Sequence, residues 1–91
     1  MSREVVPEMQ HQLSLEAYFS VVSDLSELQR KVYKAIELEE DITDKEIEDR
    51  TGLSGSTARP RRIELERKGL IYCSGFKVQS NGRKASTWRV K

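Results

Sequence analysis

Residues 54–69, SGSTARPRRIELERKG, place hydroxyl groups and arginines near the start of a stretch with helical spacing. The N–H groups at a helix N-terminus carry a partial positive charge that favours phosphate. Hydroxyl groups bond phosphates or base edges, and guanidinium groups clamp phosphates or bind guanine through two hydrogen bonds. This chemistry suits nucleic acid, and the residues that could perform it are Ser54, Gly55, Ser56, Thr57, Arg59, Arg61 and Arg62.

Two of these residues also have a structural interpretation. Arg62 could run along the core with its charge in water, which would leave Arg59 as the free cation. Gly55 could let the backbone approach a phosphate, or it could only adjust the turn. Like charges three and four residues apart repel each other, so a purely structural helix gains nothing from this crowding. We therefore expect at least two of Arg59, Arg61 and Arg62 to contact the partner.

A second basic cluster surrounds Asn81-Gly82. Asn-Gly between two strand-like runs predicts a hairpin with a type I′ turn, because both central residues of that turn need a positive φ. A basic hairpin tip favours a binding role over a merely solvated loop. The candidate binding residues of this tip are Lys77, Asn81, Arg83 and Lys84.

The same turn predicts the register of the two strands. If residue 80 pairs with residue 83, Cys73 lies opposite Val90 and Gly75 lies opposite Trp88. Cys73 then shares the buried face with Trp88 and has the role of a small apolar side chain. This register leaves two apolar side chains on the outer face, and a bulge near Ser74-Gly75 would change it. Those two side chains are Phe76 and Val78.

Charge is unevenly divided along the 91 residues. Residues 1–58 hold 6 Lys and Arg against 13 Asp and Glu, a net charge of −7. Residues 59–91 hold 10 Lys and Arg against 2 Asp and Glu, a net charge of +8. Such asymmetry between the two parts indicates a polyanionic partner for the basic part.

Capping boxes predict the starts of two helices, over about residues 26–38 and 44–50. A hydrophobic staple also fixes the entry of the second helix, and a glycine ends it in a left-handed turn. Two short helices joined by a glycine turn are typical of a helix-turn-helix arrangement. The residues that carry these signals are Ser26 with Gln29, Thr43 with Glu46, Ile42 with Ile47, and Gly52.

A third helix follows the glycine turn and runs to Lys68, with Ser54 or Ser56 as its N-cap. Pro60 conflicts with a helix interior, because proline lacks an N–H group and clashes with the preceding turn. A late start, with Ser56 or Thr57 as the cap, would place Pro60 in the first turn, where its N–H is not needed. A kinked helix is the alternative.

The chain length predicts one domain, over residues 14–91, preceded by a flexible arm over residues 1–13. Residues 14–22 could form a short helix that docks on the core, or residues 14–36 could form a homodimer contact. No apolar run approaches 18 residues, and the N-terminus lacks the apolar stretch of a secretory signal. We therefore expect a cytoplasmic location.

The sequence offers no catalytic or cofactor motif. His11, the single histidine, and Cys73, the single cysteine, form neither a metal site nor a nucleophile–base pair. A phosphate loop and a nucleotide fingerprint are both missing from the sequence. We expect a protein that is not an enzyme and holds no cofactor or metal.

The pattern over residues 25–90 resembles the winged helix-turn-helix family. The stretches that carry the resemblance are TDKEIEDRTGLSGSTA, LERKGLI and the hairpin tip SNGRK. With EAYF upstream and GRKASTW near the end, the chain is similar to small members found in phages and prophages. The resemblance implies an α+β fold with a three-helix core and a C-terminal β-hairpin wing. It also implies transcription regulation by sequence-specific binding to double-stranded DNA, with the third helix in the major groove and the wing on the backbone or minor groove.

The sequence departs from this family at residues 61 and 62, which are arginines where such helices usually place at least one aliphatic residue. The DNA-binding hypothesis needs the cations to share one surface and not to be neutralised by the chain's own carboxylates. It predicts steep salt dependence and a stronger effect of Arg59→Ala and Arg61→Ala than of Arg67→Ala. The alternative function is a protein–protein interaction module that uses acidic residues 37–49, or a DNA packaging or replication module.

Overall fold

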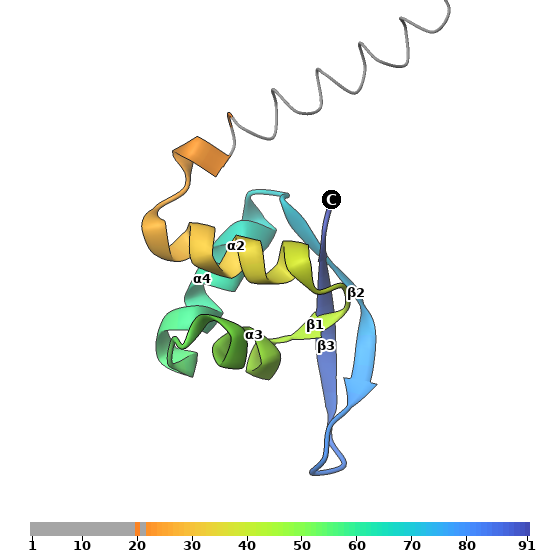
Figure 1. Ribbon diagram of the computed structural model, residues 1–91. Helices are drawn as coiled ribbons and strands as arrows, with labels where there is room; N and C mark the ends of the chain where they lie inside the picture. Colours follow the sequence, from red (N-terminus) through yellow and green to blue (C-terminus); the bar gives the residue numbers. More distant parts are fainter. Residues whose placement is uncertain (1–19, 21) are drawn as a thin grey trace, which may run out of the picture.

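The computed structural model describes residues 20 and 22–91. The arm expected over residues 1–13 and most of the helix expected over 14–22 lie outside the described residues. In Figure 1 the helices lie on one side of the sheet, and the β2–β3 hairpin, called the wing from here on, extends beyond them. The described elements are α2 (Glu27–Leu38), β1 (Ile42–Thr43), α3 (Asp44–Thr51), α4 (Gly55–Arg67), β2 (Ile71–Val78) and β3 (Lys84–Val90).

Both predicted capping boxes are confirmed. The N–H of Gln29 donates to Ser26 Oγ over 3.2 Å, and the N–H of Ser26 donates to Gln29 Oε1 over 3.0 Å. The N–H of Glu46 donates to Thr43 Oγ1 over 3.2 Å, and the N–H of Thr43 donates to Glu46 Oε1 over 2.9 Å. Each box satisfies two backbone donors, which is why α2 and α3 start at these positions.

The turn between α3 and α4 has the expected glycine. Gly52 adopts a φ of 75°, and its N–H donates to the carbonyl of Glu48 over 2.8 Å. Of the two caps predicted for the next helix, Ser54 is the one observed, and α4 begins at Gly55, so the late start at Ser56 or Thr57 does not occur. Pro60 therefore lies inside α4, where its missing N–H leaves one carbonyl of the preceding turn without its usual donor.

The expected type I′ turn at the wing tip is wrong. Gly82 has a φ of 83°, but the φ of Asn81 is not positive. The N–H of Gly82 donates to the carbonyl of Gln79 over 2.9 Å, and the N–H of Gln79 donates to the carbonyl of Arg83 over 2.8 Å. These bonds describe a three-residue loop with glycine in the left-handed position, the next most common hairpin connection.

The longer loop changes the register of the antiparallel sheet, whose strand order is β1–β3–β2. Val78 lies opposite Lys84, and a bulge between Cys73 and Gly75 shifts the pairing again. Cys73 therefore lies opposite Trp88, and the predicted pairing of Cys73 with Val90 is wrong. The irregularity falls at the position where the sequence allowed a bulge, because one extra residue enters β2 there.

The bulge also changes which side chains are exposed. Cys73 is exposed, so its predicted burial is wrong. Phe76 and Val78 are 61% and 65% exposed, as the sequence predicted. Ser74 instead turns toward other polar groups, with its Oγ 2.7 Å from Asp41 Oδ1.

Aliphatic side chains from every layer form the core. The predicted staple pair, Ile42 and Ile47, is 0% and 1% exposed, and Trp88 is buried as expected at 5%. The helices pack against the sheet through this cluster. Among the described residues, no helix is long and apolar enough to cross a membrane. The largest fully buried side chains are Val32, Ile36, Ile42, Ile47, Leu65 and Ile71.

An ion pair ties the turn before β1 to the sheet. Asp41 adopts a φ of 58°, and its carboxylate accepts from Arg89 Nε over 2.9 Å and from Nη2 over 3.2 Å. Hydrogen bonds from Arg89 and then from Ser74 lower the pKa of Asp41 below its usual value. The same contact with Asp41 raises the pKa of Arg89.

Leu65→Ala tests the position of the core. Leu65 is 0% exposed, and we expect its truncation to lower the free energy of unfolding by about 2–4 kcal/mol through lost burial and a residual cavity. Leu38→Ala is the matched control, because Leu38 is 82% exposed and its loss should change stability by less than about 0.5 kcal/mol. Urea unfolding followed by circular dichroism measures both, and equal effects would contradict this core.

The Asp41–Arg89 pair predicts acid sensitivity. Because the pKa of Asp41 is lower in the folded chain, its contribution to stability is complete above the unfolded value of about 4 and is lost as the pH falls through the folded value. Asp41→Asn should lower stability at pH 7 and flatten the decline of the unfolding free energy below pH 4. Urea unfolding from pH 7 to pH 2 measures the slope, and an unchanged slope in the variant would contradict this role.

Candidate nucleic-acid interface

A groove of about 460 Å³ lies between the start of α3, the first half of α4 and the wing. Its cations come from all three elements and outnumber its carboxylates by five to two, a net charge of +3. The charged residues of the groove are Lys45, Arg59, Arg62, Arg83 and Lys84, with Asp44 and Glu48. The fold thus brings basic residues that are far apart in the sequence to one surface.

Arg62 forms the floor of this groove. Its side chain is only 11% exposed, and it donates from Nε and Nη2 to the two carboxylate oxygens of Asp44 over 2.9 and 2.8 Å. Nη1 donates to Glu66 over 3.1 Å, and the guanidinium carbon lies 4.1 Å from the centre of the Trp88 ring. Burial lowers the pKa of Arg62, but the hydrogen bonds and attraction of Asp44 outweigh it, so the pKa is raised. Arg62 therefore has the structural role that the sequence left open.

Arg61 faces α2 and not the groove. It donates from Nε and Nη2 to the carboxylate of Glu64 over 2.9 and 2.7 Å, and the same carboxylate accepts from Gln29 Nε2 over 2.8 Å. The bonds from Gln29 and then from Arg61 lower the pKa of Glu64. Arg61 and Arg62 thus place paired charges at the two positions where the resemblance implies at least one aliphatic residue.

Arg59 is the exposed arginine of the three. Its side chain is 62% exposed, and its Nε lies 3.6 Å from Asp44 Oδ2. Residues three, four and eight apart share a helix face, so Ser56, Ile63 and Arg67 lie on the same side of α4 as Arg59. The sequence analysis missed Ile63 and Arg67, although the spacing from Arg59 would have indicated them.

The N-terminus of α4 is occupied by groups of the chain itself. The hydroxyl of Ser54 makes no cap bond to the backbone and lies 3.1 Å from Ser56 Oγ and 3.2 Å from Thr57 Oγ1. A Cβ on Gly55 would lie 2.9 Å from a carboxylate oxygen of Glu48. The glycine therefore gives room to this carboxylate, at the place where the sequence suggested a phosphate.

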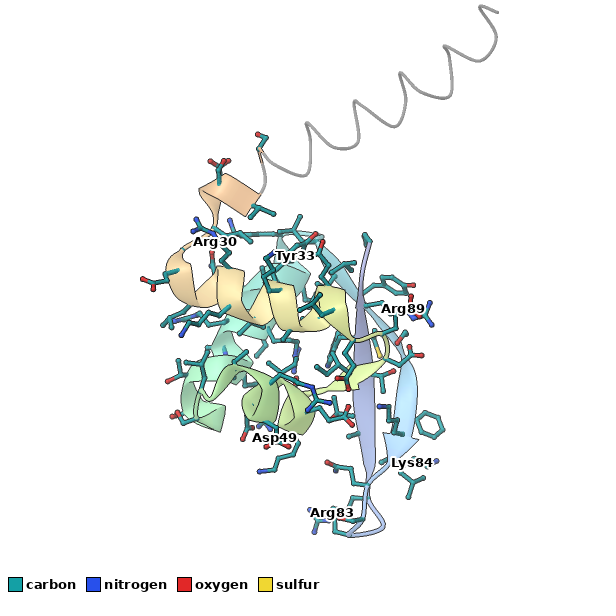
Figure 2. The ribbon with its side chains drawn as sticks, viewed as in Figure 1. Arg30, Tyr33, Asp49, Arg83, Lys84 and Arg89 are labelled. Carbon is teal, nitrogen blue, oxygen red and sulfur yellow. The ribbon has the colours of Figure 1, made fainter. Side chains whose placement is uncertain are left out.

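The wing presents two exposed cations at its end. Figure 2 shows Arg83 and Lys84 there, well away from Arg89 on the upper part of β3. Within the described residues neither Arg83 nor Lys84 lies within 4.0 Å of a carboxylate oxygen, and Lys84 Nζ lies 4.7 Å from the centre of the Phe76 ring. Asn81 shapes the loop, because its Oδ1 accepts from the N–H of Arg83 over 2.9 Å.

Lys77 is engaged at the base of the wing. Its Nζ lies 3.1 Å from Glu46 Oε1, which joins the wing to α3. The backbone bond from Thr43 and then the Lys77 contact lower the pKa of Glu46. Lys45 was not among the binding residues predicted from the sequence, but it directly precedes Glu46 in α3 and lines the groove. Only the folded arrangement of α3 beside the wing identifies it.

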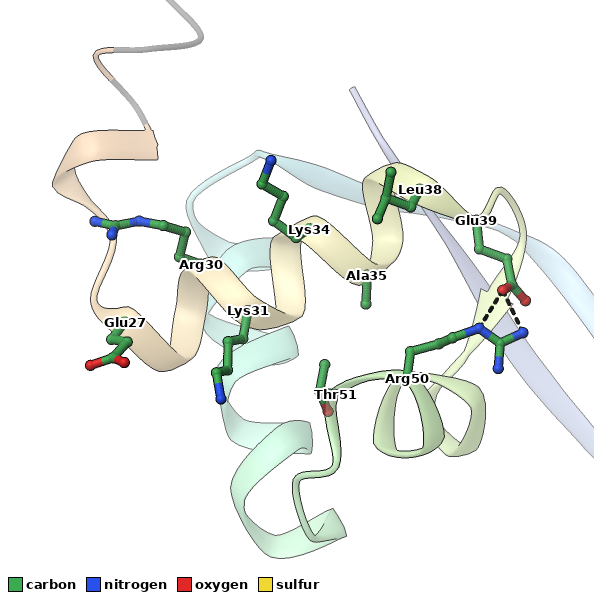
Figure 3. Close-up of a pocket in the computed structure, with 9 residues that line it drawn as sticks. All are labelled: Glu27, Arg30, Lys31, Lys34, Ala35, Leu38, Glu39, Arg50 and Thr51. Carbon is green, nitrogen blue, oxygen red and sulfur yellow. Dashed lines mark hydrogen bonds and ion pairs between the residues drawn. The ribbon is translucent and has the colours of Figure 1, made fainter.

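A second hollow, of about 670 Å³, lies on the other side of α2 (Figure 3). Arg50 closes one end by donating from Nε to Glu39 Oε1 over 2.7 Å. Leu38 lines it and is 82% exposed. The lining of this hollow contains none of the predicted DNA-binding residues, but it includes part of the predicted homodimer contact over residues 14–36, such as Arg30 and Lys34. No cluster of three or more metal-ligating side chains exists among residues 20 and 22–91.

Comparison with known proteins gives likeness of structure only. No family model matches the chain, and no curated protein matches it. A possible transcriptional regulator from Methanosarcina mazei aligns with a TM-score of 0.63 at 16% identity, over 85% of this chain and 65% of that one. Heme-free PefR aligns with a TM-score of 0.58 at 20% identity, over 99% of this chain and 79% of PefR.

A crystal structure of Staphylococcus aureus MepR in a DNA-binding conformation aligns with a TM-score of 0.54 at 18% identity, over all of this chain and 66% of MepR. The chain thus spans about two thirds of the length of MepR and of the Methanosarcina protein. Together with the α2–α3–turn–α4 arrangement and the β2–β3 hairpin, these alignments show that the chain has a winged helix-turn-helix fold.

Proposed function

We propose that the chain binds double-stranded DNA through the groove between α4 and the wing and acts as a transcription regulator. The observation that carries the proposal is the net charge of +3 in this groove, in a chain whose overall net charge is +1. Clustered cations attract a polyanion and release its counterions on binding. The major groove of B-DNA also admits an α-helix or a two-stranded β-ribbon, the two kinds of element that border this groove.

The groove residues divide into three roles in this proposal. Arg59 and its neighbours on the exposed face of α4 read base edges, because arginine binds guanine through two hydrogen bonds. Arg83 and Lys84 hold the phosphate backbone. Arg62 and Lys77 keep α3, α4 and the wing in position through their ion pairs.

The similar structures support a regulatory role, since the Methanosarcina protein is a possible transcriptional regulator and MepR is a transcription regulator, seen in one structure in a DNA-binding conformation. The phage or prophage type is supported by the resemblance of the whole pattern, with EAYF upstream and GRKASTW near the end. A regulator of this kind acts where the DNA is, which agrees with the expected cytoplasmic location. A homodimer through residues 14–36 remains part of the proposal, with the outer face of α2 as its described portion.

The alternative, a protein–protein interaction through acidic residues 37–49, has less support. Several of these carboxylates already pair with cations of the chain, which reduces the negative charge that they offer to a partner. The engaged residues and their partners are Glu39 with Arg50, Asp41 with Arg89, Asp44 with Arg62, and Glu46 with Lys77. A DNA packaging or replication module would use the same groove and differ only in its biological context.

The proposal predicts duplex binding with moderate salt dependence. Three groove cations, namely Lys45, Arg83 and Lys84, are available for phosphate, so the slope of log K against log salt should be about −3. Arg59→Ala should lower affinity about tenfold or more, and Arg83→Ala should reduce the slope by about one. Fluorescence anisotropy with a 30-base-pair duplex measures both quantities.

Arg61→Ala is the matched control, because Arg61 faces Glu64 and Gln29. It should change affinity less than Arg67→Ala, since Arg67 shares a face with Arg59. This order reverses the one expected from the sequence. No binding to any duplex at low salt would contradict the proposed function, and equal effects of the three arginines would contradict the assigned face.

A further inference from the structure

We propose that Asp44 determines specificity by holding Arg59 in the pose that reads a base edge. Asp44 would thereby disfavour the alternative in which Arg59 swings to the phosphate backbone of a non-cognate duplex. This inference rests on the DNA-binding function proposed above. A surface that only binds phosphate gains nothing from a carboxylate, so the presence of Asp44 in this groove calls for a different role.

The position of Asp44 is fixed by its contacts with Arg62. Arg62 donates hydrogen bonds to both carboxylate oxygens of Asp44 over 2.9 and 2.8 Å, and it also contacts the ring of Trp88 and the carboxylate of Glu66. The Asp44 side chain is 24% exposed, so the groove side of its carboxylate stays accessible. A carboxylate held through both oxygens cannot turn freely, which makes it a fixed reference point for a neighbouring cation.

Nε is the nitrogen of Arg59 that lies nearest to Asp44, and the two terminal nitrogens lie no closer to this carboxylate. The contact runs from Asp44 Oδ2 to Arg59 Nε at 3.6 Å. The two terminal nitrogens of a guanidinium group are the pair that binds guanine O6 and N7. In contrast, Arg61 and Arg62 each give a terminal nitrogen as well as Nε to one carboxylate. Arg59 alone among these three donates no hydrogen bond to a carboxylate within the described residues, so its terminal nitrogens are open to a base edge.

The same carboxylate opposes non-cognate binding. Moving Arg59 to a phosphate requires it to leave Asp44, and it brings a phosphate toward a fixed negative charge. Neither cost arises when Arg59 keeps its pose and meets a matching base pair. Specificity is a difference between two affinities, so a group that penalises the wrong complex raises it without adding a contact to the right one.

Asp44→Asn is the direct test, with Asp49→Asn as the matched control. Both variants remove one negative charge from α3, but no ion pair of Asp49 lies within the described residues, and Figure 2 shows Asp49 on the outside of α3. Duplexes are first enriched from a random pool with the wild-type chain. Anisotropy then gives the affinity of each variant for the enriched duplex and for a random duplex.

For Asp44→Asn we expect the affinity for the random duplex to rise about threefold to tenfold and the ratio of enriched to random affinity to fall about tenfold. Asp49→Asn should raise both affinities equally and leave the ratio unchanged. Asp44→Glu, which restores the charge, should recover part of the ratio. Equal ratios in Asp44→Asn and Asp49→Asn would overturn the inference.

Arg59→Lys keeps the test decisive if Asp44→Asn does not fold. Arg59 is 62% exposed, so this variant should fold as the wild type does. It keeps the charge but removes both the Nε contact and the planar pair of terminal nitrogens. We expect at least a tenfold loss for the enriched duplex and less than a twofold change for the random duplex, and an unchanged ratio would overturn the inference.

The two proposals fail in different ways. If the wild-type chain binds random duplex but enriches no sequence, the role of Asp44 is wrong while DNA binding stands. If the wild-type chain binds no duplex at low salt, the proposed function is wrong and the inference falls with it.

Discussion

The burial of Arg62 is the constraint on which the groove depends. This one side chain joins α4 to α3 through Asp44 and to β3 through the ring of Trp88. A guanidinium group that is 11% exposed must be matched by carboxylates, because an unpaired buried charge is very costly. Removing one partner from such a pair typically costs about 3–5 kcal/mol. The two walls of the groove are therefore fixed relative to each other by a charge and not by apolar packing alone.

The ion pairs of the fold neutralise part of the positive charge that the sequence places in residues 59–91. The requirement that the cations escape the chain's own carboxylates is met only in part. Arg61, Arg62, Lys77 and Arg89 are engaged in ion pairs, and the groove keeps its net positive charge through cations on its rim. The proposed DNA affinity of this chain should therefore depend less on its overall charge and more on the positions of a few groove side chains.

The local signals in the sequence were reliable where a short segment determines its own structure. The capping boxes at Ser26 and Thr43, the staple of Ile42 with Ile47 and the left-handed Gly52 all depend on residues within five positions of one another. The fold class followed from these signals and from the resemblance they carry.

The predictions from the sequence were wrong where contacts between elements that are far apart in the chain determine the structure. The register of β2 depends on a three-residue loop and a bulge, which together move the partner of Cys73 from Val90 to Trp88, and Cys73 is exposed. The faces of Arg61 and Arg62 depend on carboxylates of other turns and of α3, and helical spacing alone did not separate them from Arg59. Lys45 joined the site only because α3 packs beside the wing, which no local pattern indicates.

The most direct test of the groove as the DNA-binding surface is a nuclear magnetic resonance titration of the full chain with a duplex at low salt. The account expects the largest amide shifts at Lys45, Arg59, Arg83 and Lys84, with the outer face of α2 around Lys31 and Lys34 unaffected. Shifts confined to that face of α2, with the groove residues unchanged, would contradict it.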